Sequence, residues 1–162
     1  MIKANGIHHI AIMAADIREH IAFFSDVMGF QLSALFDMHG VPGGVHAFLH
    51  MDDHSYFSIV QLPAVKDIPI QLGVAHAGTG AGPSAPGTMQ HLAFRVDTLD
   101  DLLAIRDRIR TKGINVIGPM DHAMCHSIYF AGPDNMTLEV ACSTVPIDPR
   151  AWIDPAVVEK VG

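Results

Sequence analysis

The stretches H-H-I-A-I at residues 8–12 and Q-H-L-A-F at residues 90–94 decide the fold, because they are two copies of one pattern. His9 aligns with His91, 82 residues later in the chain. An internal repeat of this kind indicates that one structural unit is used twice. We therefore divide the chain into two similar halves.

A stretch with helical periodicity follows each copy. In the first half Asp16 is expected to cap a helix that ends at Gly29. In the second half Asp97 or Thr98 is expected to cap a helix that ends at Gly113, a suitable C-terminal residue.

Three strand-like runs follow each helix. In the first half they are residues 30–38, 44–51 and 56–62, and in the second half 114–120, 126–132 and 136–142. Each half therefore predicts β-α-β-β-β, and the fold class is α+β. The expected divisions are module one at about 5–62, a Gly- and Pro-containing connector at about 63–88, module two at about 89–143 and a C-terminal tail at 144–162.

Composition excludes several classes of protein. The 162 residues are 49% hydrophobic, which supplies a core and excludes a disordered chain. The formal charge of −7 argues against nucleic acid as a partner. We expect neither a membrane span nor a secretory signal, and the two cysteines, too few for a disulfide framework, favour the cytoplasm.

The stretch H-S-I-Y-F-A-G-P-D-N-M-T-L-E-V at residues 126–140 is similar to a family signature: an aromatic strand, a Pro-containing turn and a strand bearing glutamate. With the βαβββ repeat, it resembles the vicinal oxygen chelate superfamily, which includes glyoxalase I, extradiol dioxygenases, methylmalonyl-CoA epimerase and the bleomycin- and fosfomycin-resistance proteins. The resemblance implies two modules paired into a cupped, partly open mixed β-barrel around a divalent metal.

The resemblance also implies the metal ligands. The first strands would supply His9 and His91, and the last strand of module two would supply Glu139. Two imidazoles and one carboxylate form the facial triad of non-haem Fe(II) oxygen chemistry, so Fe(II) is the expected metal, with Mn, Zn or Ni as alternatives. Without a metal, a histidine on such a strand would be an ordinary core residue.

A fourth protein ligand would separate the subfamilies. The last strand of module one offers Ser58, Ile59 or Val60 at the position that matches Glu139. We favour Ile59, which would give a three-ligand, dioxygenase-like site. A register slip of two would instead bring in Gln61 and a lyase- or epimerase-like site.

The catalytic candidates are Tyr129, His122 and His126. Tyr129 resembles the tyrosine of extradiol dioxygenases that bonds a substrate oxygen, although a packed core tyrosine is the alternative. Either histidine could act as an acid or base. Further candidates, which the sequence does not rank, are His46, His50 and His76.

The remaining signals are weaker. On a strand, His8 points away from His9, toward solvent or an interface. Three histidines, His20, His39 and His54, are expected to be exposed. Cys125 could line the site, without a context that marks a reactive thiol.

These observations favour an Fe(II)-dependent extradiol-type dioxygenase that takes O₂ and a small catechol-like substrate with vicinal oxygens. The first alternative is a glyoxalase- or epimerase-like lyase or isomerase acting on an α-oxygenated carbonyl compound. The second is a non-catalytic, drug-sequestering binding protein. We expect a homodimer, because apolar module edges and Trp152 in the tail need partners.

Overall fold

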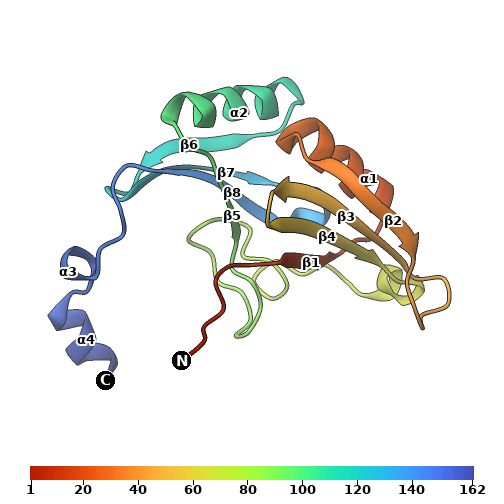
Figure 1. Cartoon of the computed structure of the whole chain (residues 1–162), viewed down its shortest axis with the longest axis horizontal. Helices are drawn as coiled ribbons and strands as arrows, with labels where there is room; N and C mark the ends of the chain where they lie inside the picture. Colours follow the sequence, from red (N-terminus) through yellow and green to blue (C-terminus); the bar gives the residue numbers. More distant parts are fainter. The chain divides into compact units, whose positions relative to one another are not determined.

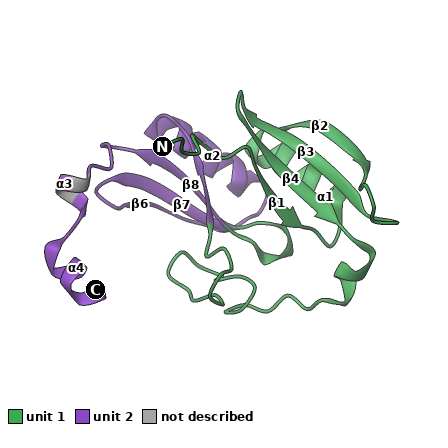
Figure 2. Cartoon of the chain, turned by 60° about the horizontal axis from the view of Figure 1, so that its bottom comes forward, with its two compact units in different colours: residues 1–91, 131–137 green, residues 92–130, 138–162 purple. Residues whose placement is uncertain are grey.

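The computed structural model describes residues 1–162, except for the side chains of residues 149 and 151. The chain forms two compact units (Figure 2). Unit 1 contains Met1–His91 and Ala131–Thr137, and unit 2 contains Leu92–Phe130 and Leu138–Gly162. The turn before the last strand of module two therefore belongs with unit 1.

Unit 1 is built on a four-stranded mixed sheet in the order β1-β4-β3-β2 (Figure 1). Its strands are β1 (His9–Met13), β2 (Gln31–Asp37), β3 (Val45–Asp52) and β4 (Ser55–Gln61). Strand β1 runs parallel to β4, and the other two pairs are antiparallel. A parallel pair needs a long crossover connection, which the helix and the two intervening strands provide.

One face of this sheet is buried and forms part of the core of unit 1. Helix α1 (Ile17–Phe23) and the π-helical turn η1 (Phe24–Met28) follow β1, and Gly29 ends them in the left-handed conformation at φ 78°. Phe24 and Phe57 are fully buried, with ring centroids 4.2 Å apart. Because strand residues alternate between faces, this packing leaves His9, Ala11 and Met13 of β1 on the opposite face, where they are exposed.

The connector contains one short 3-10 helix, η2 (Pro63–Asp67), and continues in turns to His91.

Unit 2 repeats the arrangement with strands in the order β5-β8-β7-β6. They are β5 (Leu92–Arg95), β6 (Val116–Asp121), β7 (Cys125–Ala131) and β8 (Thr137–Ser143), and helix α2 is Leu99–Thr111. Thr98 caps α2 by accepting a hydrogen bond from the Asp101 N–H. The α+β class, the βαβββ repeat and the two helices are thus as predicted.

Two further segments complete the chain. The turn η3 (Pro133–Asn135) joins β7 to β8, and helices α3 (Pro149–Trp152) and α4 (Pro155–Val161) form the tail. Pro155 is the first residue of α4, and 39% of Trp152 is exposed. Within the described part of the chain, no helix has the length and apolar character to cross a membrane.

Candidate functional site

The open face of the unit 1 sheet carries His9 among aromatic rings. The His9 and Phe48 ring centroids are 5.5 Å apart, and those of His46 and Phe48 are 4.5 Å apart. The Nδ1 atoms of His8 and His9 lie 2.9 Å apart, so His8 contacts its neighbour directly. Burial, and then the nearby His9, lower the pKa of His46, which is therefore neutral at pH 7.

Strand register identifies the counterpart of Glu139 in the first module. Ala93, two residues after His91, pairs with Glu139. Ala11, two residues after His9, pairs with Ser58. The counterpart is therefore Ser58, and the favoured Ile59 lies one residue away on the core face, where it is fully buried.

Ser58 is engaged with a neighbouring strand. Its side chain is fully buried, and its Oγ lies 2.5 Å from His46 Nε2. A neutral hydroxyl is not among the usual ligands of the divalent transition metals. The first module thus has no carboxylate at the position that Glu139 occupies in the second.

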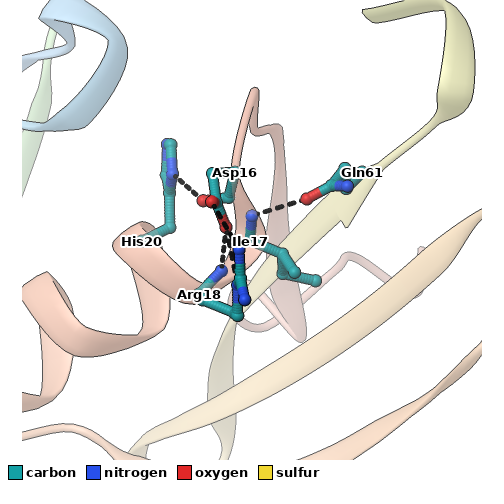
Figure 3. A network of polar contacts seen from close by, with 5 residues as sticks. All are labelled: Asp16, Ile17, Arg18, His20 and Gln61. Atoms are coloured by element: carbon teal, nitrogen blue, oxygen red, sulfur yellow. Dashed lines mark hydrogen bonds and ion pairs between the residues drawn. The ribbon is translucent and has the colours of Figure 1, made fainter.

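Gln61 is hydrogen bonded to the start of helix α1. Its Oε1 accepts a hydrogen bond of 2.7 Å from the Ile17 N–H, one of the unpaired donors at the helix start (Figure 3). Asp16 caps the same helix through the Arg18 N–H. Gln61 shares the core face of β4 with Ile59, so it lies on the opposite side of the strand from Ser58.

His20 is a buried member of the same network, and the expectation that it is exposed is wrong. Its Nδ1 lies 3.1 Å from the Asp16 carbonyl oxygen, and its Nε2 lies 3.4 Å from Asp134 Oδ2. Asp134 also accepts a 2.8 Å hydrogen bond from the Ala15 N–H. His20 lies three residues after the buried Ile17, and this spacing places both side chains on the buried face of α1. His39 and His54 are exposed, as predicted.

His91 lies immediately before β5 and lines a cavity of about 730 Å³ within unit 1. The strand end at Met13, the connector and the turn before β8 also contribute to its wall. The lining is mainly apolar, including Val65, Ile68 and Ile70. The lining also contains His76, one of the three further acid or base candidates. His76 therefore shares this cavity with the predicted ligand His91.

Gln90 holds His91 and the connector together. The Gln90 Oε1 is hydrogen bonded to His91 Nδ1. Its Nε2 lies 3.2, 3.1 and 2.9 Å from the carbonyl oxygens of Thr79, Gly80 and Gly82.

Unit 2 brings Glu139 and Tyr129 together. Glu139 is 5% exposed on β8. Burial raises the pKa of Tyr129, and the charge of Glu139 and a hydrogen bond to it raise it further. The Tyr129 hydroxyl also lies 3.1 Å from His122 Nε2. The phenol is therefore protonated at neutral pH and is shared between a carboxylate and an imidazole.

His126 lies elsewhere on β7. It shares a strand face with the fully buried Ile128, whereas Tyr129 shares the other face with Ser127 and Cys125. The His126 Nε2 is 4.0 Å from Asp121 Oδ2. Of the two histidines proposed to accompany Tyr129, the structure pairs it with His122.

The three predicted ligands are divided between the units: His9 and His91 belong to unit 1, and Glu139 belongs to unit 2. Among the side chains that the structure describes, no group of three or more His, Cys, Asp or Glu is assembled to hold a metal ion. The ligand set therefore stays a prediction. Its donor chemistry nevertheless suits a divalent metal, because imidazole nitrogens and carboxylate oxygens are common ligands of such metals.

Two βαβββ repeats, with His9 beginning the first strand of one and His91 immediately preceding the first strand of the other, define the class of the vicinal oxygen chelate proteins. This chain belongs to the Glyoxalase/Bleomycin resistance protein/Dioxygenase superfamily, whose family model matches residues 6–140. The resemblance inferred from the sequence is confirmed.

Among characterised proteins, the chain is 28% identical over 153 residues to the biphenyl-2,3-diol 1,2-dioxygenase of Paraburkholderia xenovorans (strain LB400), covering 91% of this chain and 44% of that protein. A 66-residue stretch is 36% identical to biphenyl-2,3-diol 1,2-dioxygenase 2 of Rhodococcus globerulus, covering 40% of this chain and 35% of that protein. The chain thus spans less than half the length of these relatives.

Solved structures share the fold. A glyoxylase/bleomycin resistance protein/dioxygenase domain from Frankia sp. EAN1pec aligns with a TM-score of 0.69 at 12% identity, covering 87% of this chain and 99% of that one. The fosfomycin resistance protein FosX from Listeria monocytogenes, solved with Mn(II) and sulfate, aligns with a TM-score of 0.59 at 17% identity, covering 88% and 96%.

Proposed function

We propose that this chain provides the metal site of an extradiol-type, ring-cleaving dioxygenase acting on a catechol-like substrate. The observation that carries the proposal is the register that sets Ser58 opposite Ala11, where Glu139 stands opposite Ala93. A site with one carboxylate and two imidazoles keeps positions open for other ligands. The similarity to the biphenyl-2,3-diol dioxygenases supports the same activity.

In this proposal His9, His91 and Glu139 would hold Fe(II). When bound, the metal would supply Lewis-acid chemistry for the two vicinal oxygens of a catechol and the oxygenase chemistry that O₂ requires. Ring cleavage adds both atoms of one O₂ to one catechol and breaks a ring C–C bond beside the diol. The four electrons that reduce O₂ come from the substrate, so the reaction needs no further reductant.

Tyr129 acts as a hydrogen-bond donor to a substrate oxygen. Its raised pKa keeps the proton on the phenol throughout the neutral range. His122, 3.1 Å from the hydroxyl, orients the phenol and exchanges protons with it.

His76 is the proposed base for a catechol hydroxyl. It lines the same cavity as His91, whereas His46 is engaged with Ser58 and His50 is exposed. The apolar wall formed by Val65, Ile68 and Ile70 suits a catechol that carries an aryl or alkyl group.

The lyase or isomerase alternative requires a fourth protein ligand. The candidate, Gln61, is engaged with the start of α1, which weighs against that alternative. The matching histidines of the two repeats, His9 and His91, and the carboxylate of Glu139 weigh against a drug-sequestering protein that binds no metal.

The test is anaerobic purification and loading with Fe(II), followed by O₂ uptake with catechol, 3-methylcatechol and 2,3-dihydroxybiphenyl. We expect one Fe(II) per chain, stoichiometric O₂ consumption and a coloured ring-opened product, with the aryl-substituted catechol preferred. Loading without O₂ uptake on any diol, together with turnover of an α-oxygenated carbonyl compound, would transfer the chain to the lyase or isomerase branch.

A further inference from the structure

We infer that Gln90 is a positioning residue that sets the tautomer of His91 and fastens the glycine-rich part of the connector to it. The inference rests on the proposed function, because it gives His91 a ligand's role. It concerns contacts within unit 1 alone.

The orientation of the Gln90 amide follows from its neighbours. Its nitrogen faces three carbonyl oxygens, those of Thr79, Gly80 and Gly82, at 3.2, 3.1 and 2.9 Å. A flipped amide would place its oxygen against these acceptors, with no donor between them. The amide nitrogen therefore faces the connector, and the amide oxygen faces His91.

This orientation determines which nitrogen of His91 carries the proton. The Gln90 Oε1 can only accept, so His91 Nδ1 must donate to it. In a neutral imidazole the lone pair then lies on Nε2, which becomes the metal-binding atom. A metal-binding histidine is commonly fixed through its other ring nitrogen in this way.

In the first repeat, the residue before the predicted ligand is not a glutamine. His9 is preceded by His8, and the two Nδ1 atoms lie 2.9 Å apart. An imidazole can donate or accept, so this contact leaves the tautomer of His9 open. The tautomer of His91 is therefore set by its sequence neighbour, whereas the tautomer of His9 is not.

Gln90 also connects the ligand to the cavity wall. The carbonyl groups that it binds belong to the connector, which also carries His76 and part of the apolar lining of the cavity. A change at Gln90 should therefore loosen the connector and release the His91 ring at the same time.

The experiment compares Gln90→Met and Gln90→Glu with the unchanged chain and with Gln31→Met, a control at an exposed position on β2. The primary measurement is the ¹⁵N NMR tautomer signature of His91 in metal-free protein. We expect the Nδ1–H form in the unchanged chain, in Gln31→Met and in Gln90→Glu, whose carboxylate still accepts the hydrogen bond from Nδ1–H. Gln90→Met should give a mixture of tautomers and bind Co(II) about 10–100-fold more weakly.

Hydrogen exchange of the residue 79–87 amides is the second measurement. Both Gln90 variants should exchange faster than Gln31→Met, because both lose the amide donors. An Nε2–H tautomer in the unchanged chain, or an unaltered tautomer in Gln90→Met, would overturn the inference. These readings need no substrate and no O₂, so they stand apart from the outcome of the dioxygenase assay. If Gln90→Met does not fold, Gln90→Glu and the unchanged chain still decide the tautomer.

Discussion

At the residue scale, the candidate side chains are distinguished by their neighbours. His91 lines the cavity and is held by Gln90, and Tyr129 lies between Glu139 and His122. Other polar residues make structural contacts instead. His20 is buried against Asp134, and Ser58 is hydrogen bonded to His46. Residue type alone therefore does not identify a site residue, and its neighbours do.

Replacing His91 by alanine is expected to abolish stoichiometric metal binding while the chain stays folded. The side chain lies at a cavity wall, so its loss removes a ligand without opening the core. Metal content by mass spectrometry and the melting temperature are measured on one preparation, with the exposed His39→Ala as control. A full metal equivalent in His91→Ala would remove His91 from the ligand set.

Replacing Tyr129 by phenylalanine is expected to keep the metal and the fold and to lower kcat by about 100-fold or more, as for a positioned proton-transfer group. The ring packing is retained, and only the hydroxyl, with its bonds to His122 and Glu139, is lost. An unchanged kcat with a loss of about 1 kcal/mol in the free energy of unfolding would mark a structural tyrosine instead.

At the element scale, the start of α1 and the turn before β8 are joined by hydrogen bonds within unit 1. Gln61 from the end of β4 and Asp134 from η3 accept from the Ile17 and Ala15 N–H groups. Neighbouring elements thus satisfy one backbone donor of the first helical turn, the Ile17 N–H, and one in the segment that leads into the helix, the Ala15 N–H.

Gln61→Leu is expected to lower the free energy of unfolding by about 0.5–1.5 kcal/mol, because the Ile17 N–H loses its partner. Metal affinity should stay the same, since the side chain points to the helix. Chemical denaturation and Co(II) titration are compared with Gln71→Leu, a change at an exposed connector position. A large loss of metal affinity would support the four-ligand alternative.

Asp134 allows a matched pair of variants. Its φ of 52° is left-handed, a conformation that asparagine tolerates better than alanine, and its carboxylate accepts from the Ala15 N–H. Asp134→Ala should cost about 1–3 kcal/mol in the free energy of unfolding, and Asp134→Asn clearly less. Equal losses in urea denaturation would show that neither the backbone conformation nor this hydrogen bond matters there.

At the scale of the whole molecule, two similar sheets carry different candidate functional side chains. Unit 1 holds a histidine- and aromatic-rich face and an apolar cavity, while unit 2 holds the carboxylate, the tyrosine and its histidine. Repetition of one fold therefore leaves each copy free to specialise at matching positions, as Ser58 and Glu139 do.

The tail supports the expectation of a homodimer. Helix α4 exposes Val157, Val158 and Val161 by 52%, 51% and 76%. Light scattering after size exclusion should give twice the 17.5 kDa chain mass. Val157→Asp/Val161→Asp should shift the mass toward the monomer, and Glu159→Gln, on the same helix, should not. A monomer at every concentration would contradict the expected dimer.

The sequence by itself determined the class of the fold, the repeat and most strand bounds, because hydrophobic periodicity and glycine- and proline-rich turns are local signals. The repeat and the family signature in the sequence also identified His9, His91 and Glu139 as candidate metal ligands. Only the tertiary structure selected Ser58 over Ile59, buried His20 against Asp134, grouped His76 with His91 and separated His126 from Tyr129. These are long-range facts: a one-residue change of register moves every side chain of a strand to the other face, and no local pattern specifies which distant groups meet.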